Sequence, residues 1–408
     1  MIKIKTLIEL FDSCQIENVI AGLKFLPQKI VFVGFKEVMT QKRMRDLEKF
    51  FGLRKLNVQL EYIFVERYDY KSIYNKLNEI VDMNEDCCFD LTGGKELVLT
   101  AMGAVSAVRE IPMVQFNVRT GNLIRVKNSD NFVETGTIAI KIKESVVLNG
   151  GAVVDNEKQD FNWDLNDEFK KDIDTIWGIC KGNCGLWNRQ SNVFDNFEKF
   201  GRIEDELRLT VNLNHMKNCK QDTFLSKKIV GSLIKNKFIT DYSLVDGILT
   251  FKYKNSQIKE CIIKAGNILE LYVYKTAKEI ALEEPSFYDD IDVGIFVDWD
   301  GNIHNEACSQ KDTRNEIDVI LMKDLVPIFI SCKNGEVKKE ALYELSTMAD
   351  RFGGEYARKV LLATYINNDD ESRKAIKQRA QDMNISIIDN VDKMGKEDFI
   401  ATLRKRTK

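Results

Sequence analysis

The chain has 408 residues, of which 44% are hydrophobic and 30% charged, and its formal net charge is −3 at pH 7. This length suits two or three domains that each bury a core, and the composition excludes a largely disordered protein. The near-neutral charge excludes a broadly basic nucleic-acid coat, so any contact with nucleic acid must be local.

The N-terminal stretch MIKIKTLIELF carries charges through its first half and lacks a small-residue cleavage site, so it predicts a strand rather than a signal peptide. No run of about 18 apolar residues occurs, so we expect no membrane span. The nine cysteines are odd in number and scattered, which favours reduced thiols in a cytoplasmic protein over a disulfide framework.

Residues 1 to about 125 alternate strand-like apolar runs with helical patterns. Apolar residues recur at nearly every third or fourth position between the runs, which predicts amphipathic helices. Strands and helices in alternation predict an α/β fold with a mostly parallel, Rossmann-like sheet and helices on both faces. The five runs are IKTLIELF, KIVFVGF, NVQLEYIFV, CCFDLT and PMVQFNV.

Two loops are expected at the carboxyl ends of these strands, where such sheets bind ligands. They are DSCQIEN after the first strand and DLTGGKE after the fourth. Gly93 and Gly94 allow a tight turn, and a helix that starts near Lys95 offers free N–H groups to an anion. The loop is not a Walker A motif, because Glu96 stands where a Ser or Thr would hold magnesium. A plain strand-to-helix turn with a solvated lysine is the alternative.

The segments LIELFDSCQIENVIAGLKFLPQKIVFVG and FDLTGGKELVLTAM, which contain these loops, resemble the CRISPR-associated Rossmann-fold (CARF) sensor domain. The resemblance implies a homodimer that binds cyclic oligoadenylate across its two-fold axis through both loops. The ligand-binding residues that it implies are Ser13, Cys14, Gln15, Thr92, Gly93, Gly94 and Lys95.

The middle of the chain is less informative. The stretch TIAIKIKESVVL predicts a strand over residues 137–148, and SKKIVGSLIKNKFITDYSLVDGILTFKYK predicts a helix followed by a hairpin that turns at Asp246 and Gly247. This winged-helix-like pattern suits a nucleic-acid-binding element or a spacer, and the few basic residues of the helix favour the spacer. We expect a sensor domain at 1–145, a helical, winged-helix-like segment at 146–260 and a third domain at 261–408.

A zinc site is one interpretation of four residues in the middle segment. Their spacings are C-x3-C and H-x3-C. The first spacing is looser than the usual C-x2-C, and buried free cysteines are common, so unrelated side chains are the alternative. The four residues are Cys180, Cys184, His215 and Cys219.

The last third predicts a helix at 259–284, three antiparallel strands, a second amphipathic helix and then a strand, a helix and a strand. Asp318 lies in the second of the three strands, and Lys333 ends the third. Hydrolysis of a phosphodiester needs a metal that polarises an oxygen and lowers the pKa of water, and hard oxygen ligands select magnesium or manganese. A cation beside the nucleophile stabilises the charge of the transition state. Strand-edge charges that face water are the alternative.

This order, with Asp318 and Lys333 so placed, resembles the PD-(D/E)xK nuclease superfamily and implies a restriction-endonuclease-like α/β domain. In that family the aspartate binds a divalent metal and the lysine orients or deprotonates the attacking water. Glu270, on the preceding helix, matches an acidic residue that many members direct at the metal.

Ser331 stands where the superfamily pattern has an acidic residue, two positions before the lysine. The following helix, expected to begin near Val337, offers Glu340 and Glu344 as replacements. We expect Glu344 to be the better placed, with a solvent-facing glutamate as the alternative. The implied metal ligands are Asp318, Glu270, Glu344 and the carbonyl of Cys332.

The combination resembles the type III CRISPR ancillary nucleases. It implies activation by cyclic tetra-adenylate and cleavage of single-stranded RNA and DNA, with nicking of duplex DNA, in antiviral defence. A rival interpretation is a ligand-sensing transcription regulator with a catalytically inactive C-terminal domain. That protein would bind specific duplex sequences and need no metal.

Overall fold

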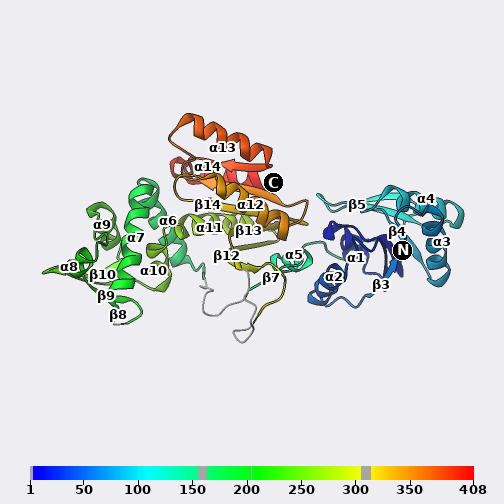
Figure 1. Ribbon diagram of the computed structural model, residues 1–408, viewed down its shortest axis with the longest axis horizontal. Coiled ribbons are helices and arrows are strands. Elements are labelled where there is room, and N and C mark those ends of the chain that lie inside the picture. The colour runs from blue at the N-terminus through cyan, green and yellow to red at the C-terminus, as the bar shows by residue number, and fades with distance from the viewer. Residues whose placement is uncertain (1–2, 155–162, 204, 305–313) are drawn as a thin grey trace.

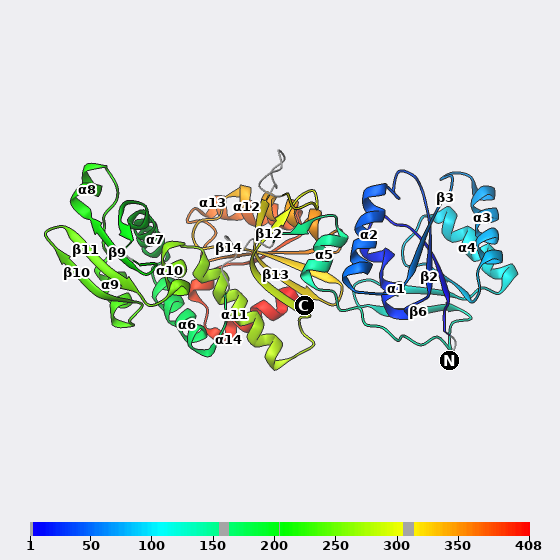
Figure 2. The same ribbon diagram turned by 90° about the horizontal axis from the view of Figure 1, so that it is seen from below.

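The computed structural model describes residues 3–154, 163–203, 205–304 and 314–408. They form three sheets, each with its own helices, arranged in a row (Figure 1). The C-terminal sheet lies between the N-terminal sheet and the middle sheet, and the view from below shows the same order (Figure 2).

The N-terminal sheet has the strand order β3-β2-β1-β4-β5-β6. Its first five strands pair in parallel, and β6 pairs antiparallel with β5, so the predicted mostly parallel sheet is confirmed and the edge strand β6 is an addition. The strands are β1 (Thr6–Leu10), β2 (Lys29–Gly34), β3 (Gln59–Phe64), β4 (Cys87–Asp90), β5 (Met113–Asn117) and β6 (Asn122–Lys127).

Helices cover both faces of this sheet, as predicted. Buried side chains of α1 and α2 pack on one face, and those of α3 and α4 pack on the other. The helices are η1 (Gln15–Asn18), α1 (Ile20–Phe25), α2 (Gln41–Leu53), α3 (Tyr70–Met83) and α4 (Glu96–Arg109).

The strand predicted over residues 137–148 is wrong, because the structure has helix α5 (Ile142–Leu148) there. The carboxylate of Glu144 accepts a hydrogen bond from the backbone N–H of Lys141 (2.8 Å), which caps the helix. Ile142 and Val146, one turn apart, are both buried. Packing of this face overrides the β-branched composition that favoured a strand. After α5, β7 (Ala152–Val153) pairs with the C-terminal sheet.

The middle sheet is antiparallel, with the order β10-β11-β9-β8. The predicted helix and hairpin are confirmed, and Asp246 and Gly247 both have positive φ (51° and 79°) at the turn. The elements are α6 (Asp167–Lys181), α7 (Cys184–Phe200), β8 (Arg202–Ile203), β9 (Arg208–Asn212), α8 (Leu213–Asn218), α9 (Lys227–Lys235), β10 (Ile239–Val245), β11 (Ile248–Tyr253) and α10 (Ser256–Ile263).

The C-terminal sheet has the order β16-β15-β14-β13-β12-β7. Strands β12 to β14 are antiparallel, whereas β15 and β16 continue in parallel from β14. The elements are α11 (Asn267–Glu283), β12 (Asp290–Asp298), β13 (Arg314–Lys323), β14 (Val326–Lys333), α12 (Lys339–Phe352), β15 (Arg358–Ala363), α13 (Asp370–Asp382), β16 (Ile385–Ile388), η2 (Val391–Lys393) and α14 (Lys396–Thr407).

Two expectations for this region need correction. The single helix expected over 259–284 is two helices, because α10 ends at Ile263 and α11 starts only after Gly266. The final helix α14 was not predicted, although Phe399 and Leu403 are buried at helical spacing.

The apolar cores do not stop at the borders between sheets. One cluster runs from the α1/α2 face of the N-terminal sheet through α5 to the α12/α13 face of the C-terminal sheet. A second joins the middle sheet and its helices to α11, α14 and the other face of the C-terminal sheet. Among the described residues, no helix has the length and apolarity to cross a bilayer.

Candidate nuclease and activator sites

The structure brings Asp318, Ser331 and Lys333 together on neighbouring strands. The pairing of Val319 with Ile330 places Asp318 opposite Ser331. One oxygen of Asp318, Oδ2, accepts hydrogen bonds from the backbone N–H of Cys332 (2.7 Å) and from Oγ of Ser331 (3.2 Å), and Nζ of Lys333 lies 3.7 Å from it. These donors fix the carboxylate, so Oδ1 is the oxygen left to point at a ligand.

Glu270 lies in the same cleft, as expected. A cavity of about 440 Å³ between α11 and strands β12 and β13 is lined by Glu270, Asp292, Glu316 and Asp318. Burial, together with the charges of Asp318 and Glu316, raises the pKa of Glu270 to about 8. Because these carboxylates disfavour one another's ionisation, a bound cation would stabilise the group.

Glu316 is a residue of this cleft that the sequence analysis missed. Burial and the charge of Asp318 raise its pKa as well. It stands two residues before Asp318 on β13, and strand residues two apart point to the same face. The alternation in NEID was therefore the signal that could have identified it.

Glu344 lines a smaller cavity that also contains Glu316, Asp318, Ser331 and Lys333. Helix α12 begins at Lys339, two residues later than expected, and Leu342, Leu345 and Ala349 are buried on its core side as expected. Glu344 and Glu340 are both exposed, but only Glu344 is among the residues that line this cavity.

The donor set fits a hard divalent cation in chemistry and charge, since it consists of carboxylate and carbonyl oxygens. Its geometry is open: among the described residues, no three His, Cys, Asp or Glu side chains lie close enough to hold a metal ion. The thiol of Cys332 is buried and burial raises its pKa well above the usual value, so only the backbone of this residue is suited to the site.

The four candidate zinc ligands do not form one site. Cys180 and Cys184 are buried at the junction of α6 and α7, where Sγ of Cys180 accepts a hydrogen bond from the side chain of Asn334 (3.3 Å). His215 and Cys219 belong to the α8 region, with Sγ of the exposed Cys219 3.8 Å from Nε2 of His215. In the parts of the chain that the structure describes, no three such residues gather, so this interpretation is wrong.

The first predicted ligand loop is a tightly hydrogen-bonded turn after β1. Oδ1 of Asp12 accepts hydrogen bonds from the backbone N–H of Cys14 (2.9 Å) and from Oγ of Ser13 (3.2 Å). Asn18 donates to Oε1 of Gln15 (3.1 Å). Nε2 of Gln15 is buried and has no hydrogen-bond partner among the described residues, so this donor is available to a ligand.

The second loop lies against the first. A Cβ built on Gly93 would lie 3.0 Å from both Cβ of Asp12 and Oε2 of Glu17, and Gly94 has φ of +143°. Thr92 is held within the protein, because its hydroxyl bonds Asp90 (2.5 Å) and accepts from the backbone N–H of Phe116 (2.9 Å). Lys95 occupies the N-cap position of α4, where its side chain makes no capping hydrogen bond, and it is exposed.

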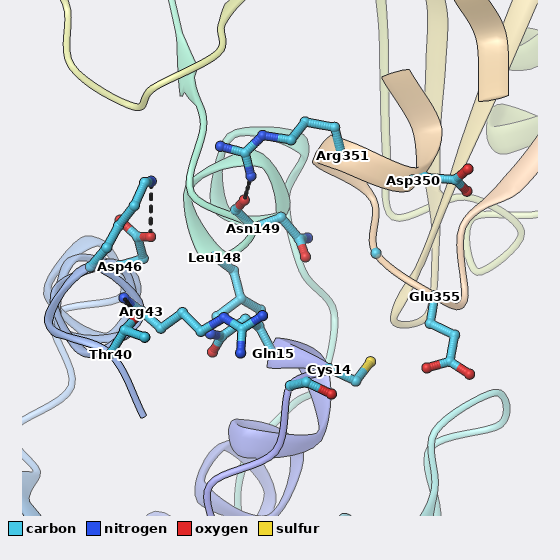
Figure 3. A pocket seen from close by; sticks show the side chains of 13 residues that line it. Cys14, Gln15, Thr40, Arg43, Asp46, Leu148, Asn149, Asp350, Arg351 and Glu355 are labelled. Atoms are coloured by element: carbon cyan, nitrogen blue, oxygen red, sulfur yellow. Dashed lines mark hydrogen bonds and ion pairs between the residues drawn. The ribbon is translucent and has the colours of Figure 1, made fainter. Parts of the chain in front are cut away.

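A cavity of about 380 Å³ separates the first loop from the C-terminal sheet (Figure 3). In Figure 3 Arg43 of α2 and Glu355, which follows α12, lie on opposite sides of it. Of the seven predicted ligand residues, this cavity includes Ser13, Cys14 and Gln15. It also includes the charged side chains of Lys42, Arg43, Asp46, Asp350, Arg351 and Glu355.

Comparison with known proteins agrees with this layout. Residues 259–405 match the family model described as Card1-like, endonuclease domain. No curated protein sequence matches the chain.

Solved structures resemble nearly the whole chain. Protein VC1899 from Vibrio cholerae has a TM-score of 0.75 at 17% identity and covers 98% of this chain and 97% of its own. Can2 from Sulfobacillus thermosulfidooxidans, solved with cyclic tetra-adenylate, has a TM-score of 0.68 at 16% identity, with 99% of both chains covered. A type III CRISPR defence DNA nuclease activated by cyclic oligoadenylate has a TM-score of 0.50 at 13% identity and covers 90% of this chain and 46% of its own.

At these identities the structural likeness is one of fold, and the family match covers the C-terminal region. Both agree with the CARF and nuclease resemblance of the sequence. Residues 259–405 are therefore similar to the Card1-like endonuclease domain family, and the chain has, over nearly its whole length, a fold like that of Can2.

Proposed function

We propose that the protein is a nuclease that cyclic oligoadenylate activates, with cyclic tetra-adenylate as the activator. The observation that carries this proposal is the cluster of Asp318, Ser331 and Lys333 beside Glu270 and Glu316, inside a Card1-like endonuclease domain. The cyclic tetra-adenylate bound to Can2, which shares the fold, supports the choice of activator.

In this proposal Asp318, Glu270, Glu344 and the carbonyl of Cys332 hold manganese or magnesium. The metal, when bound, polarises the scissile phosphate and lowers the pKa of a water molecule. Lys333 orients the attacking water and offsets negative charge on the phosphate. Ser331 keeps Asp318 in place through its hydroxyl.

The activator binds across the two-fold axis of a homodimer, against the two loops of each subunit. Gln15 offers its unpaired Nε2, and Lys95 at the start of α4 offers a charge to a phosphate or ribose. The substrates are single-stranded RNA and DNA, and duplex DNA is nicked.

The test is to incubate the protein with labelled single-stranded RNA or DNA, manganese and each cyclic oligoadenylate in turn. We expect cleavage with cyclic tetra-adenylate and none when a chelator is added. The rival, a ligand-sensing transcription regulator, requires sequence-specific binding of duplex DNA and no cleavage with any ring size. That result would refute the nuclease proposal.

A further inference from the structure

A hydrogen bond joins the first ligand loop, DSCQIEN, to the loop that follows α12 in the C-terminal region. The hydroxyl of Tyr356, in the loop between α12 and β15, donates to Oε1 of Glu17 at 2.7 Å. Glu17 belongs to η1, which forms the second half of the first loop, DSCQIEN. The bond joins residues that are 339 positions apart in the chain.

The other oxygen of the same carboxylate lies against the second ligand loop, DLTGGKE. Oε2 of Glu17 lies 3.0 Å from the point where a Cβ of Gly93 would be, so the carboxylate sits directly against this glycine. An anion that approaches the loop at Gly93 meets a protein carboxylate already there. The anion and Glu17 exclude each other by volume and by charge.

The surroundings of Glu17 already disfavour its charge. Burial, and the nearby Asp12, Glu355 and Asp90, raise its pKa to about 7, although the hydrogen bond from Tyr356 acts in the opposite direction. A phosphate added to these carboxylates increases the repulsion further. A phosphate bound at Gly93 therefore acts directly on Glu17.

Tyr356 connects this position to the nuclease site through a short path. Gly353, Gly354 and Glu355 separate it from the end of α12, and Gly354 has φ of +71°. Helix α12 carries Glu344, which lines the cavity of Asp318 and Lys333. A change at the C-terminal end of α12 can therefore alter the position of Glu344 relative to Asp318 and Lys333.

We propose that Glu17 is an internal anion of the activator site, which the phosphate of the activator displaces from Gly93, and that the displacement breaks the bond to Tyr356 and releases the loop between α12 and β15 from this restraint. The end of α12 itself stays bonded, because Arg351 donates to the carbonyls of Asn149 (2.7 Å) and Trp299 (2.6 Å). The inference rests on the proposed function, which it extends to how the nuclease site is regulated. Contacts of α2 with the C-terminal region remain in place during this step. Among them, Nζ of Lys42 donates to the carbonyl of Gly150 (2.9 Å), and Arg54 pairs with Glu144 (2.9 Å).

The test is the Tyr356→Phe variant, which removes only the hydroxyl. We expect ligand-free cleavage of labelled single strands to rise about tenfold, the effect of losing one hydrogen bond to a charged group. Calorimetry should show tighter binding of cyclic tetra-adenylate. The matched control is Tyr343→Phe, on α12 with its side chain 50% exposed, which should behave like the wild type.

A second variant, Glu17→Gln, keeps the size of the side chain and an oxygen that accepts from Tyr356. At pH 8 it should bind cyclic tetra-adenylate several-fold more tightly than the wild type, because the competing charge is gone. If both variants match the wild type in ligand-free cleavage and affinity while cyclic tetra-adenylate activates all three proteins, this inference is wrong and the proposed function stands. If the wild type neither binds nor responds to any cyclic oligoadenylate, the proposed function fails and this inference with it.

Discussion

Asp318 and Ser331 face each other across β13 and β14, and the serine hydroxyl lies 3.2 Å from Oδ2 of the aspartate. Where the superfamily pattern has a second carboxylate, this chain has a hydrogen-bond donor that orients the first. Other elements place carboxylates in the same cavity, since Glu270 comes from α11 and Glu316 from β13 itself.

The first prediction concerns Asp318 and Lys333. Asp318→Ala and Lys333→Ala should each lower cleavage by about a thousandfold or more, because the metal or the orientation of its water is lost. Binding of cyclic tetra-adenylate, measured by calorimetry, should not change, since the two sites lie on different sheets. Lys338→Ala, an exposed lysine at the N-cap of α12, is the control and should keep full activity. An active Asp318→Ala protein would contradict the assignment.

The second prediction separates the two glutamates of α12. Glu344→Gln should raise the manganese concentration that supports half-maximal cleavage far more than Glu340→Gln does, because only Glu344 lines the cavity of Asp318. Manganese titrations of the cleavage rate measure this. Equal titrations for both variants and the wild type would mean that α12 supplies no ligand, which leaves Glu270, Asp318 and the carbonyl of Cys332.

The third prediction concerns Lys95. Lys95→Ala should weaken binding of cyclic tetra-adenylate by about 1.5 to 3 kcal/mol per site, the usual contribution of a charge-assisted hydrogen bond. The activation curve should move to higher ligand concentration at an unchanged maximal rate. Lys71→Ala, an exposed lysine in the first turn of α3, is the control. Unchanged activation at limiting ligand would show that Lys95 is only a surface charge.

The fourth prediction is a pH dependence of stability. The pKa of Glu17 is raised from 4.5 to about 7, so the folded protein holds this proton more tightly than the unfolded chain does. Protonation of Glu17 therefore favours folding below about pH 4.5, and this contribution is lost as the pH rises to about 7. Urea unfolding of metal-free protein between pH 4.5 and 8 should show Glu17→Gln gaining stability relative to the wild type across that interval. A constant difference would mean that Glu17 titrates normally.

The sequence predicted the sheets better than the connections between them. The runs that became β1 to β5 alternate with clear helical patterns, and those that became β12 to β14 were predicted as three consecutive strands; the order of both sets is confirmed. The prediction of a strand over residues 137–148 was wrong because Ile and Val favour a strand locally, whereas α5 is stabilised by packing against segments far away in the chain. The interruption of the helix near Gly266 was missed because the apolar spacing continues across it.

The sites show the same limit. Asp318 and Lys333 were identifiable because each ends up in a regular strand whose neighbours the pattern reveals. Glu316 could have been added from its spacing to Asp318. The hydrogen bond between Glu17 and Tyr356 could not have been predicted from the sequence. It joins a helical turn near one end of the chain to a loop near the other, and it depends on how two sheets dock.

The apolar cluster that passes from the α1/α2 face through α5 into the C-terminal sheet limits which N-terminal domains can be exchanged between related proteins. A sensor grafted from a related protein would bring its own surface to α5 and leave side chains such as Ile142 and Val146 facing an unmatched partner. Chimaeras should fold only when the crossover carries α2 and α5 together. A graft that keeps the loops of the N-terminal sheet but changes this cluster should therefore lose the surface through which the two sheets dock.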